Sequence, residues 1–220
     1  MQVRISDIQM REALHFMGWR GTPIDDQTLA QIRTVMDTVR REITAHVIMR
    51  RFKLDDQKRL MGTVFAPQGD DMKKMLSGCD EAVLLAATLG AQSERLLLRQ
   101  QASDNAQALI MDAVLSAAIE AVCDQQETLL RKEAACEGYY LTDRFSPGYG
   151  DMPIQQTREI CDVLQTSRSI GLTVSYSGIM IPRKSVTAII GLSRVPQAHR
   201  PSPCAVCNMR GRCALSTIGK

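Results

Sequence analysis

The residues best suited to bind a ligand lie in a six-residue stretch that begins at Arg144. The guanidinium of Arg144 can bind a carboxylate or phosphate, and Tyr149 offers an aromatic face to a base or a cation. Between them, Ser146, Pro147 and Gly148 predict a type II β-turn, because proline fixes φ and glycine permits a positive φ. The turn should hold Arg144 near Tyr149, which suits a zwitterionic ligand that carries a nucleoside.

Carboxylates in a long helical pattern form a second candidate group. Asp112, Glu120 and Asp124 are separated by multiples of four residues, which places them roughly on one side of a helix. Carboxylates in that position could face the ammonium or sulfonium group of a ligand.

Both groups also have a simpler explanation. Arg144 could belong to an ordinary surface turn and pair with Asp143 or Asp151. The carboxylates of the helix could form a solvated stripe. The residue types alone leave these alternatives open.

Three cysteines near the C-terminus form a candidate metal site. Cys204, Cys207 and Cys213 have the spacing Cys-x-x-Cys-x5-Cys, which brings two thiolates onto one turn and a third within reach. Zinc, an iron–sulfur cluster and a reduced, metal-free tail are equally compatible with this spacing. A fourth ligand could come from an exogenous molecule or from one of His199, Cys79, Cys123, Cys136 and Cys161. Three of these, Cys123, Cys136 and Cys161, lie in helical patterns and are expected to be small buried residues.

Composition and the absence of familiar motifs exclude several classes of protein. The 27 basic and 24 acidic residues are too balanced to predict nucleic-acid binding. No secretory signal and no uninterrupted apolar run of membrane-spanning length occurs, so we expect no membrane association and a cytoplasmic location. In the cytoplasm the seven cysteines are expected to stay reduced or to bind metal. The sequence contains no P-loop, dinucleotide-binding glycine pattern, Gly-x-Ser-x-Gly or His-Glu-x-x-His. His15 and His46 are expected to be packing or surface residues rather than general bases.

The periodicity of apolar residues predicts the elements that position these groups. Capping signals and helical spacing indicate a helix that Ser6 caps and that ends near Met17, one from Asp25 or Asp26 to about Ile43, and others over 70–76, 91–100, about 103–136 and 154–169. Strands are expected over 45–54 and 59–66, as a hairpin, and over 82–89, 172–176 and 185–192. The alanine-rich helix capped by Ser103 should lie at the centre of the fold. We divide the chain into one domain over 1–195, with N-terminal helices and a hairpin in 1–100 and the motifs in 101–195, and a cysteine-rich tail over 196–220.

Several spaced motifs together resemble the activation domain at the C-terminus of cobalamin-dependent methionine synthase. The resemblance covers roughly residues 104 to 195, and the segment 16–21 looks like the stand-alone versions of that domain. The motifs are Asp112-Ala113-x6-Glu120, Arg144-x-x-Pro147-Gly148-Tyr149-x-x-x-Pro153, Ile170-Gly171-Leu172-Thr173 and Met180-x-Pro182-x-x-Ser185-Val186.

The resemblance implies an α+β fold with a twisted antiparallel sheet flanked by helices, and it implies S-adenosylmethionine as the ligand. Arg144 would hold the carboxylate of the ligand, and Glu120, in the same motif as Asp112, would face its positive end. The pocket would be lined by Ser146, Pro147, Gly148 and Tyr149. The stretch 188–191 lacks an aromatic residue that the attached domain has in its last strand, so one wall of the pocket should differ.

The implied function is that of an accessory activator acting in trans on a cobalamin-dependent methionine synthase or a related corrinoid protein. The chain would present S-adenosylmethionine to the corrinoid of that partner, with electrons from a flavodoxin- or ferredoxin-type donor. The attached domain lacks the cysteine tail, and our separate hypothesis is that this tail carries or receives the electron. One alternative is a metal-stabilised docking or chaperone module that binds no methyl donor. Another is a free-standing small-molecule methyltransferase.

Overall fold

The computed structural model describes residues 1–19, 21 and 23–197, so the three cysteines of the tail and His199 lie outside the described residues. The fold is α+β, as expected. Its strands are β1 (Gln2–Arg4), β2 (Thr44–Lys53), β3 (Glu81–Thr88), β4 (Tyr140–Leu141), β5 (Thr173–Val174), β6 (Met180–Ile181) and β7 (Ser185–Ser193). Its helices are α1 (Met10–Phe16), α2 (Asp26–Glu42), α3 (Asp70–Leu76), α4 (Gly90–Ser103), α5 (Asn105–Cys136), α6 (Gln156–Leu164) and α7 (Thr166–Ile170).

A curled antiparallel sheet divides the molecule into two layers of helices. Its strand order is β1-β2-β3-β7-β4, and every neighbouring pair is antiparallel. The central strands β3 and β7 are buried along almost their whole length, which explains their continuous apolar sequences. The short strands β5 and β6 form a separate two-stranded ladder.

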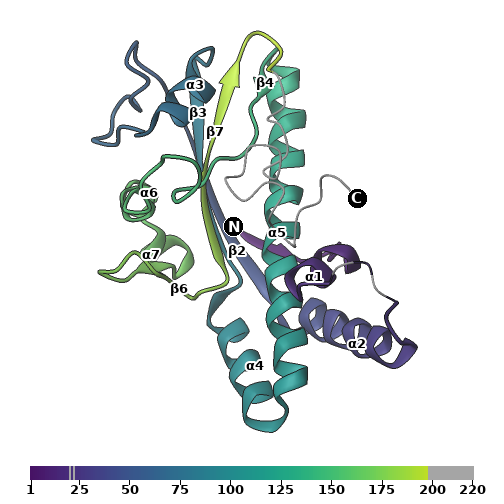
Figure 1. Ribbon diagram of the computed structural model, residues 1–220. Helices are drawn as coiled ribbons and strands as arrows, with labels where there is room; N and C mark the ends of the chain where they lie inside the picture. Colours follow the sequence, from purple (N-terminus) through teal and green to yellow (C-terminus); the bar gives the residue numbers. More distant parts are fainter. Residues whose placement is uncertain (20, 22, 198–220) are drawn as a thin grey trace.

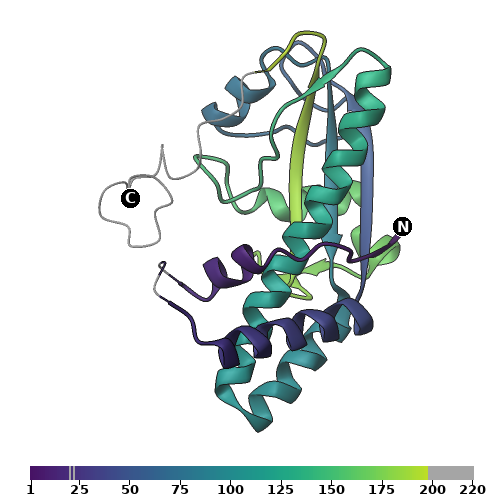
Figure 2. The same cartoon turned by 90° about the vertical axis from the view of Figure 1, so that its right-hand side faces the viewer.

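Helices α1, α2, α4 and α5 cover one face of the sheet, and α5 runs along it in the middle of the molecule (Figures 1 and 2). Asp104 caps α5, because its carboxylate accepts hydrogen bonds from the backbone N–H groups of Ala106 and Gln107 at 2.8 and 3.3 Å. Among the described helices only α5 has the length and composition of a membrane span. However, 61% of the most apolar 18-residue window of α5 is buried inside the fold, as in the core helix of a globular domain.

Helices α3, α6 and α7 lie on the opposite side of the sheet and enclose a second core (Figure 1). Its centre contains Phe65, Phe145 and Ile160, each at most 1% exposed. The side chain of Gln156 is fully buried and joins α6 to the loop before α3, because its amide donates to the carbonyl of Ala66 and accepts from the N–H of Gln68.

The structure corrects the predicted hairpin. Strand β2 forms, but its partners are β1 and β3, and the predicted return strand over 59–66 is reduced to one bridge between Leu54 and Leu60. Asp55 causes the difference, since its carboxylate binds the N–H groups of Gln57 and Arg59 as well as the Arg59 side chain. These bonds close a compact loop in place of a ladder.

Other predicted boundaries are also shifted. Helix α1 begins after Gln9, not after Ser6, and α5 begins after Asp104, not after Ser103. The predicted helix over 154–169 is interrupted at Gln165, which has a left-handed conformation with φ of 52° and separates α6 from α7. The predicted strand over 172–176 is reduced to the two residues of β5, while β6 lies within the segment expected to be a connection.

Candidate functional site

A groove of about 790 Å³ lies between α5 and the segment that contains α1, and Arg144 and Tyr149 form part of its lining. Helix α5 contributes Glu120 and Asp124, one turn apart on the same side. The N-terminal wall, which the sequence did not associate with the site, contributes Asp7, Glu12, His15 and Phe16.

Arg144 reaches this groove because the chain around it is extended. Phe145 forms a bridge with Ile189 of β7, through two backbone hydrogen bonds of 2.9 and 2.8 Å. Successive residues of an extended chain point to opposite faces, so Phe145 enters the second core while Arg144 is directed toward α5.

The predicted turn follows immediately. The N–H of Tyr149 donates to the carbonyl of Ser146 at 3.2 Å, and Gly148 has φ of +91°, the positive value that the third position of a type II turn needs. Ser146, Pro147 and Gly148 are not part of the groove lining; they shape the turn that leaves Tyr149 64% exposed at the groove.

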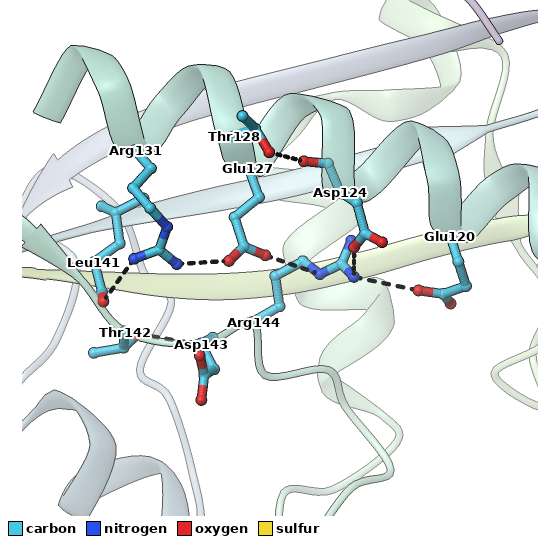
Figure 3. A network of polar contacts seen from close by, with 9 residues as sticks. All are labelled: Glu120, Asp124, Glu127, Thr128, Arg131, Leu141, Thr142, Asp143 and Arg144. Atoms are coloured by element: carbon cyan, nitrogen blue, oxygen red, sulfur yellow. Dashed lines mark hydrogen bonds and ion pairs between the residues drawn. The ribbon is translucent and has the colours of Figure 1, made fainter. Parts of the chain in front are cut away.

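Three carboxylates of α5 surround the guanidinium of Arg144 (Figure 3). Its Nη2 lies 2.7 Å from Asp124 and 3.3 Å from Glu120, and its Nε lies 3.3 Å from Glu127. The side chain of Arg144 is only 18% exposed. A simple surface turn does not describe this arrangement. The carboxylate of Asp151 has another role, because it binds the N–H groups of Asp70 and Asp71 at the start of α3.

The remaining nitrogen of Arg144, Nη1, is buried without a hydrogen-bond partner in the described part of the chain. Burial opposes the charge of Arg144, but the nearby Cys123, Asp124, Glu120 and Glu127 raise its pKa above the ordinary value. Burial raises the pKa of Cys123 to about 12, although Arg144 opposes that shift. Cys123 is therefore a neutral thiol beside a permanently charged guanidinium at neutral pH.

Glu120 is held in a partly dehydrated position at the groove. Burial raises its pKa above the ordinary value, Arg144 opposes the shift, and the neighbouring Asp124 and Glu12 add to it. The groove thus contains a cluster of carboxylates around one guanidinium, a combination suited to a ligand with both a carboxylate and a positive group.

Asp112 lies elsewhere on α5, outside the groove lining. Its carboxylate pairs with Nζ of Lys184 at 2.8 Å, and the same ammonium donates to the hydroxyl of Ser116 at 2.7 Å. The acidic stripe predicted from the sequence therefore divides into two parts, one near Lys184 and the other at Arg144.

Two residues beside the groove were missed by the sequence analysis. Glu127 extends the acidic stripe by three residues beyond Asp124, and its other oxygen accepts from Arg131 at 2.8 Å. Arg131 in turn approaches the carbonyl of Leu141 at 3.5 Å (Figure 3). The helical spacing of Glu120, Asp124 and Glu127 is the pattern from which the position of Glu127 beside the groove could have been predicted.

Within residues 1–19, 21 and 23–197, no group of three or more His, Cys, Asp or Glu side chains is arranged to hold a metal. Cys79, Cys123 and Cys161 are buried thiols, as expected for the last two. Cys136 is exposed, contrary to the expectation, because it is the last residue of α5. A metal at Cys204, Cys207 and Cys213 remains a prediction.

Comparison with known proteins identifies the fold but no sequence family. No family model and no curated protein matches the chain. Among solved structures, the crystal structure of the MetH reactivation domain bound to AdoHcy matches with a TM-score of 0.64 and covers 90% of this chain and 80% of that one. The fold is therefore that of a methionine synthase reactivation domain. With 14% sequence identity, the likeness shows the architecture and not the ligand of this chain.

Proposed function

We propose that this protein binds S-adenosylmethionine in the groove between α1 and α5 and presents it to the corrinoid of a separate cobalamin-dependent methionine synthase or related corrinoid protein. The observation that carries the proposal is the position of Arg144, which faces Glu120 at 3.3 Å in a groove that Tyr149 also lines. The fold supports it, because the matched reactivation domain was crystallised with AdoHcy.

The groove fits an S-adenosyl ligand in size and chemistry. Its volume of about 790 Å³ is within the usual range of small-molecule sites. The guanidinium of Arg144 matches an α-carboxylate, Glu120 matches an ammonium or sulfonium group, and the exposed ring of Tyr149 can lie against a base.

In this function the chain positions a methyl donor and a partner accepts the methyl group. The partner's corrinoid would accept the methyl group after it receives one electron from a flavodoxin- or ferredoxin-type donor, and the electron pair of the broken C–S bond would remain on S-adenosylhomocysteine. The residues of this chain orient the donor: Arg144 fixes the amino-acid end, and Glu120 stabilises the positive charge beside it.

Calorimetric titration with S-adenosylmethionine tests the binding step. Arg144→Ala should weaken binding at least about tenfold, because a hydrogen bond to a charged group contributes about 1.5–3 kcal/mol. Arg158→Ala is the matched control, since Arg158 binds the carbonyl of Ser175 and does not line the groove. Equal affinities for the wild type and Arg144→Ala would contradict this site.

The activator role requires a second assay, the reactivation of an oxidised corrinoid methionine synthase that lacks its own activation domain. Reactivation should depend on this protein, on S-adenosylmethionine and on Arg144. A protein that docks on the corrinoid enzyme but binds no S-adenosylmethionine would be a docking module instead. Methyl transfer to a small molecule without any corrinoid protein would indicate a free-standing methyltransferase.

A further inference from the structure

We infer that Asp124 occupies the place of the ligand's carboxylate on Arg144 and is displaced when a carboxylate-bearing ligand enters. This inference rests on the proposed function. It assigns a role to a residue that the resemblance did not include, and it makes Asp124 a determinant of which ligands the groove prefers.

The guanidinium has little free capacity for a ligand. Its Nη1 is buried, and its Nε is paired with Glu127 at 3.3 Å. The two hydrogens of Nη2 face Glu120 at 3.3 Å and Asp124 at 2.7 Å, and both of these residues line the groove. A ligand carboxylate that binds Arg144 through Nη2 must therefore replace one of the two.

Glu127 and Glu120 are poorly suited to leave. Glu127 is 19% exposed and is held by two arginines, since Arg131 donates to its other oxygen at 2.8 Å (Figure 3). Glu120 is the carboxylate proposed to face the positive end of the ligand, so its loss would remove a favourable contact.

Asp124 is the displaceable member. Its side chain is 69% exposed, and in the described part of the chain Arg144 is the only partner recorded for its carboxylate. The hydroxyl of Thr128 binds the backbone carbonyl of Asp124 and does not restrain the carboxylate (Figure 3). An exposed ion pair contributes little to stability, so the exchange for a ligand carboxylate has a small cost.

The consequence is a specific effect on ligand preference. A ligand that has an ammonium group but no carboxylate leaves Asp124 in place and is attracted by it. A ligand that also has a carboxylate must displace Asp124 and is repelled by its charge. Removal of this charge should therefore favour the carboxylate-bearing ligand relative to the other.

The test measures the affinities of S-adenosylhomocysteine and of its decarboxylated analogue for the wild type, Asp124→Asn and Asp124→Ala. Both variants should raise the ratio of affinities in favour of S-adenosylhomocysteine, by about twofold to fivefold, the size of an exposed charge interaction. Glu133→Gln is the control, because Glu133 is exposed on α5 and does not line the groove; it should leave the ratio unchanged.

Two kinds of failure can be told apart. A wild type that binds neither compound overturns both the proposed function and this inference. A wild type that binds S-adenosylhomocysteine, with an unchanged or lower ratio in both Asp124 variants, overturns the inference alone. Thermal unfolding of each variant identifies any change caused by a loss of folded protein.

Discussion

At the scale of single residues, the site depends on how Arg144 is neutralised. Cys123 remains a neutral thiol at neutral pH because burial raises its pKa to about 12. The recorded ion pairs of Arg144 are instead with three carboxylates of α5, and each carboxylate differs in exposure and in its other partners. In the proposed function, these differences allow one guanidinium to serve both the fold and a ligand.

Glu120→Gln should weaken binding of S-adenosylmethionine by up to about fivefold and affect S-adenosylhomocysteine less, because only the former carries a sulfonium charge. The pKa of Glu120 is raised by burial above 4.5, so the wild type should lose its preference for the sulfonium as pH falls from neutrality toward 4.5. For Glu120→Gln, the ratio of the affinities for the two ligands should stay constant over that range. Calorimetric titration of each ligand at several pH values measures these ratios.

The same shift predicts the sign of the effect on stability. A carboxyl whose pKa is raised by folding contributes stability that is fully present below its ordinary pKa and is lost as pH rises through the folded value. At neutral pH, Glu120→Gln should therefore unfold at the same or a higher temperature than the wild type. A lower unfolding temperature would mean that the ion pair with Arg144 outweighs the cost of burial.

The sequence identified Arg144, Glu120 and Tyr149 as candidates, and the predicted turn placed Arg144 near Tyr149. Only the resemblance brought Glu120 to them. Residue types indicated what each could bind, while the distance between α5 and the turn after Arg144 is set by tertiary packing. The N-terminal wall with Asp7 and Glu12 was missed for the same reason, because no local pattern indicates which distant segment will cover a helix.

At the scale of elements, long periodic segments were predictable and short ones were not. Helices α2 and α5 and strands β3 and β7 form close to their predicted ranges, since burial of one helix face or of a whole strand leaves a pattern in the sequence. Strands β1 and β4 have three and two residues, too few for a pattern, and exist because β2 and β7 provide partners.

Gly191 shows how closely β7 packs against α3 and the loop after it. A Cβ on Gly191 would lie 2.5 Å from Sγ of Cys79 and 3.1 Å from side-chain carbons of Leu76 and Thr142. Gly191→Ala should therefore lower the free energy of unfolding by about 1–3 kcal/mol through overpacking. Chemical denaturation measures the change.

Gly78→Ala is the matched control for this prediction. A Cβ on Gly78 would make an ordinary contact, 3.4 Å from the side chain of Gln197. If both glycine variants lose the same stability, the close packing around Gly191 is not the cause.

At the scale of the whole molecule, the groove joins three parts of the chain that are far apart in sequence: the segment around α1, the middle of α5 and the turn after β4. The fold class was predictable through the resemblance and is confirmed by the reactivation-domain architecture. Figure 2 shows how the N-terminal segment passes over α5, a long-range placement that strand and helix periodicity does not encode.

The division of the chain at the cysteine tail can be tested by a protein that ends at Gln197. Every helix and strand of the described fold lies before that residue, so the shortened protein should unfold at the same temperature and bind S-adenosylmethionine with the same affinity as the full chain. Iron or zinc, if Cys204, Cys207 and Cys213 bind it, should be found only in the full chain purified without oxygen. Lower ligand affinity of the shortened protein would show that the tail belongs to the site.

At Phe145 and Asp151, the segment from Arg144 to Asp151 is held by parts of the fold that do not line the groove. Phe145 is anchored in the second core and along β7, and the carboxylate of Asp151 holds the first turn of α3. The conformational entropy of this segment is therefore given up when the chain folds, not when a ligand arrives. The proposed ligand would therefore meet a segment that these contacts have already ordered, so more of its contact energy would be retained as affinity.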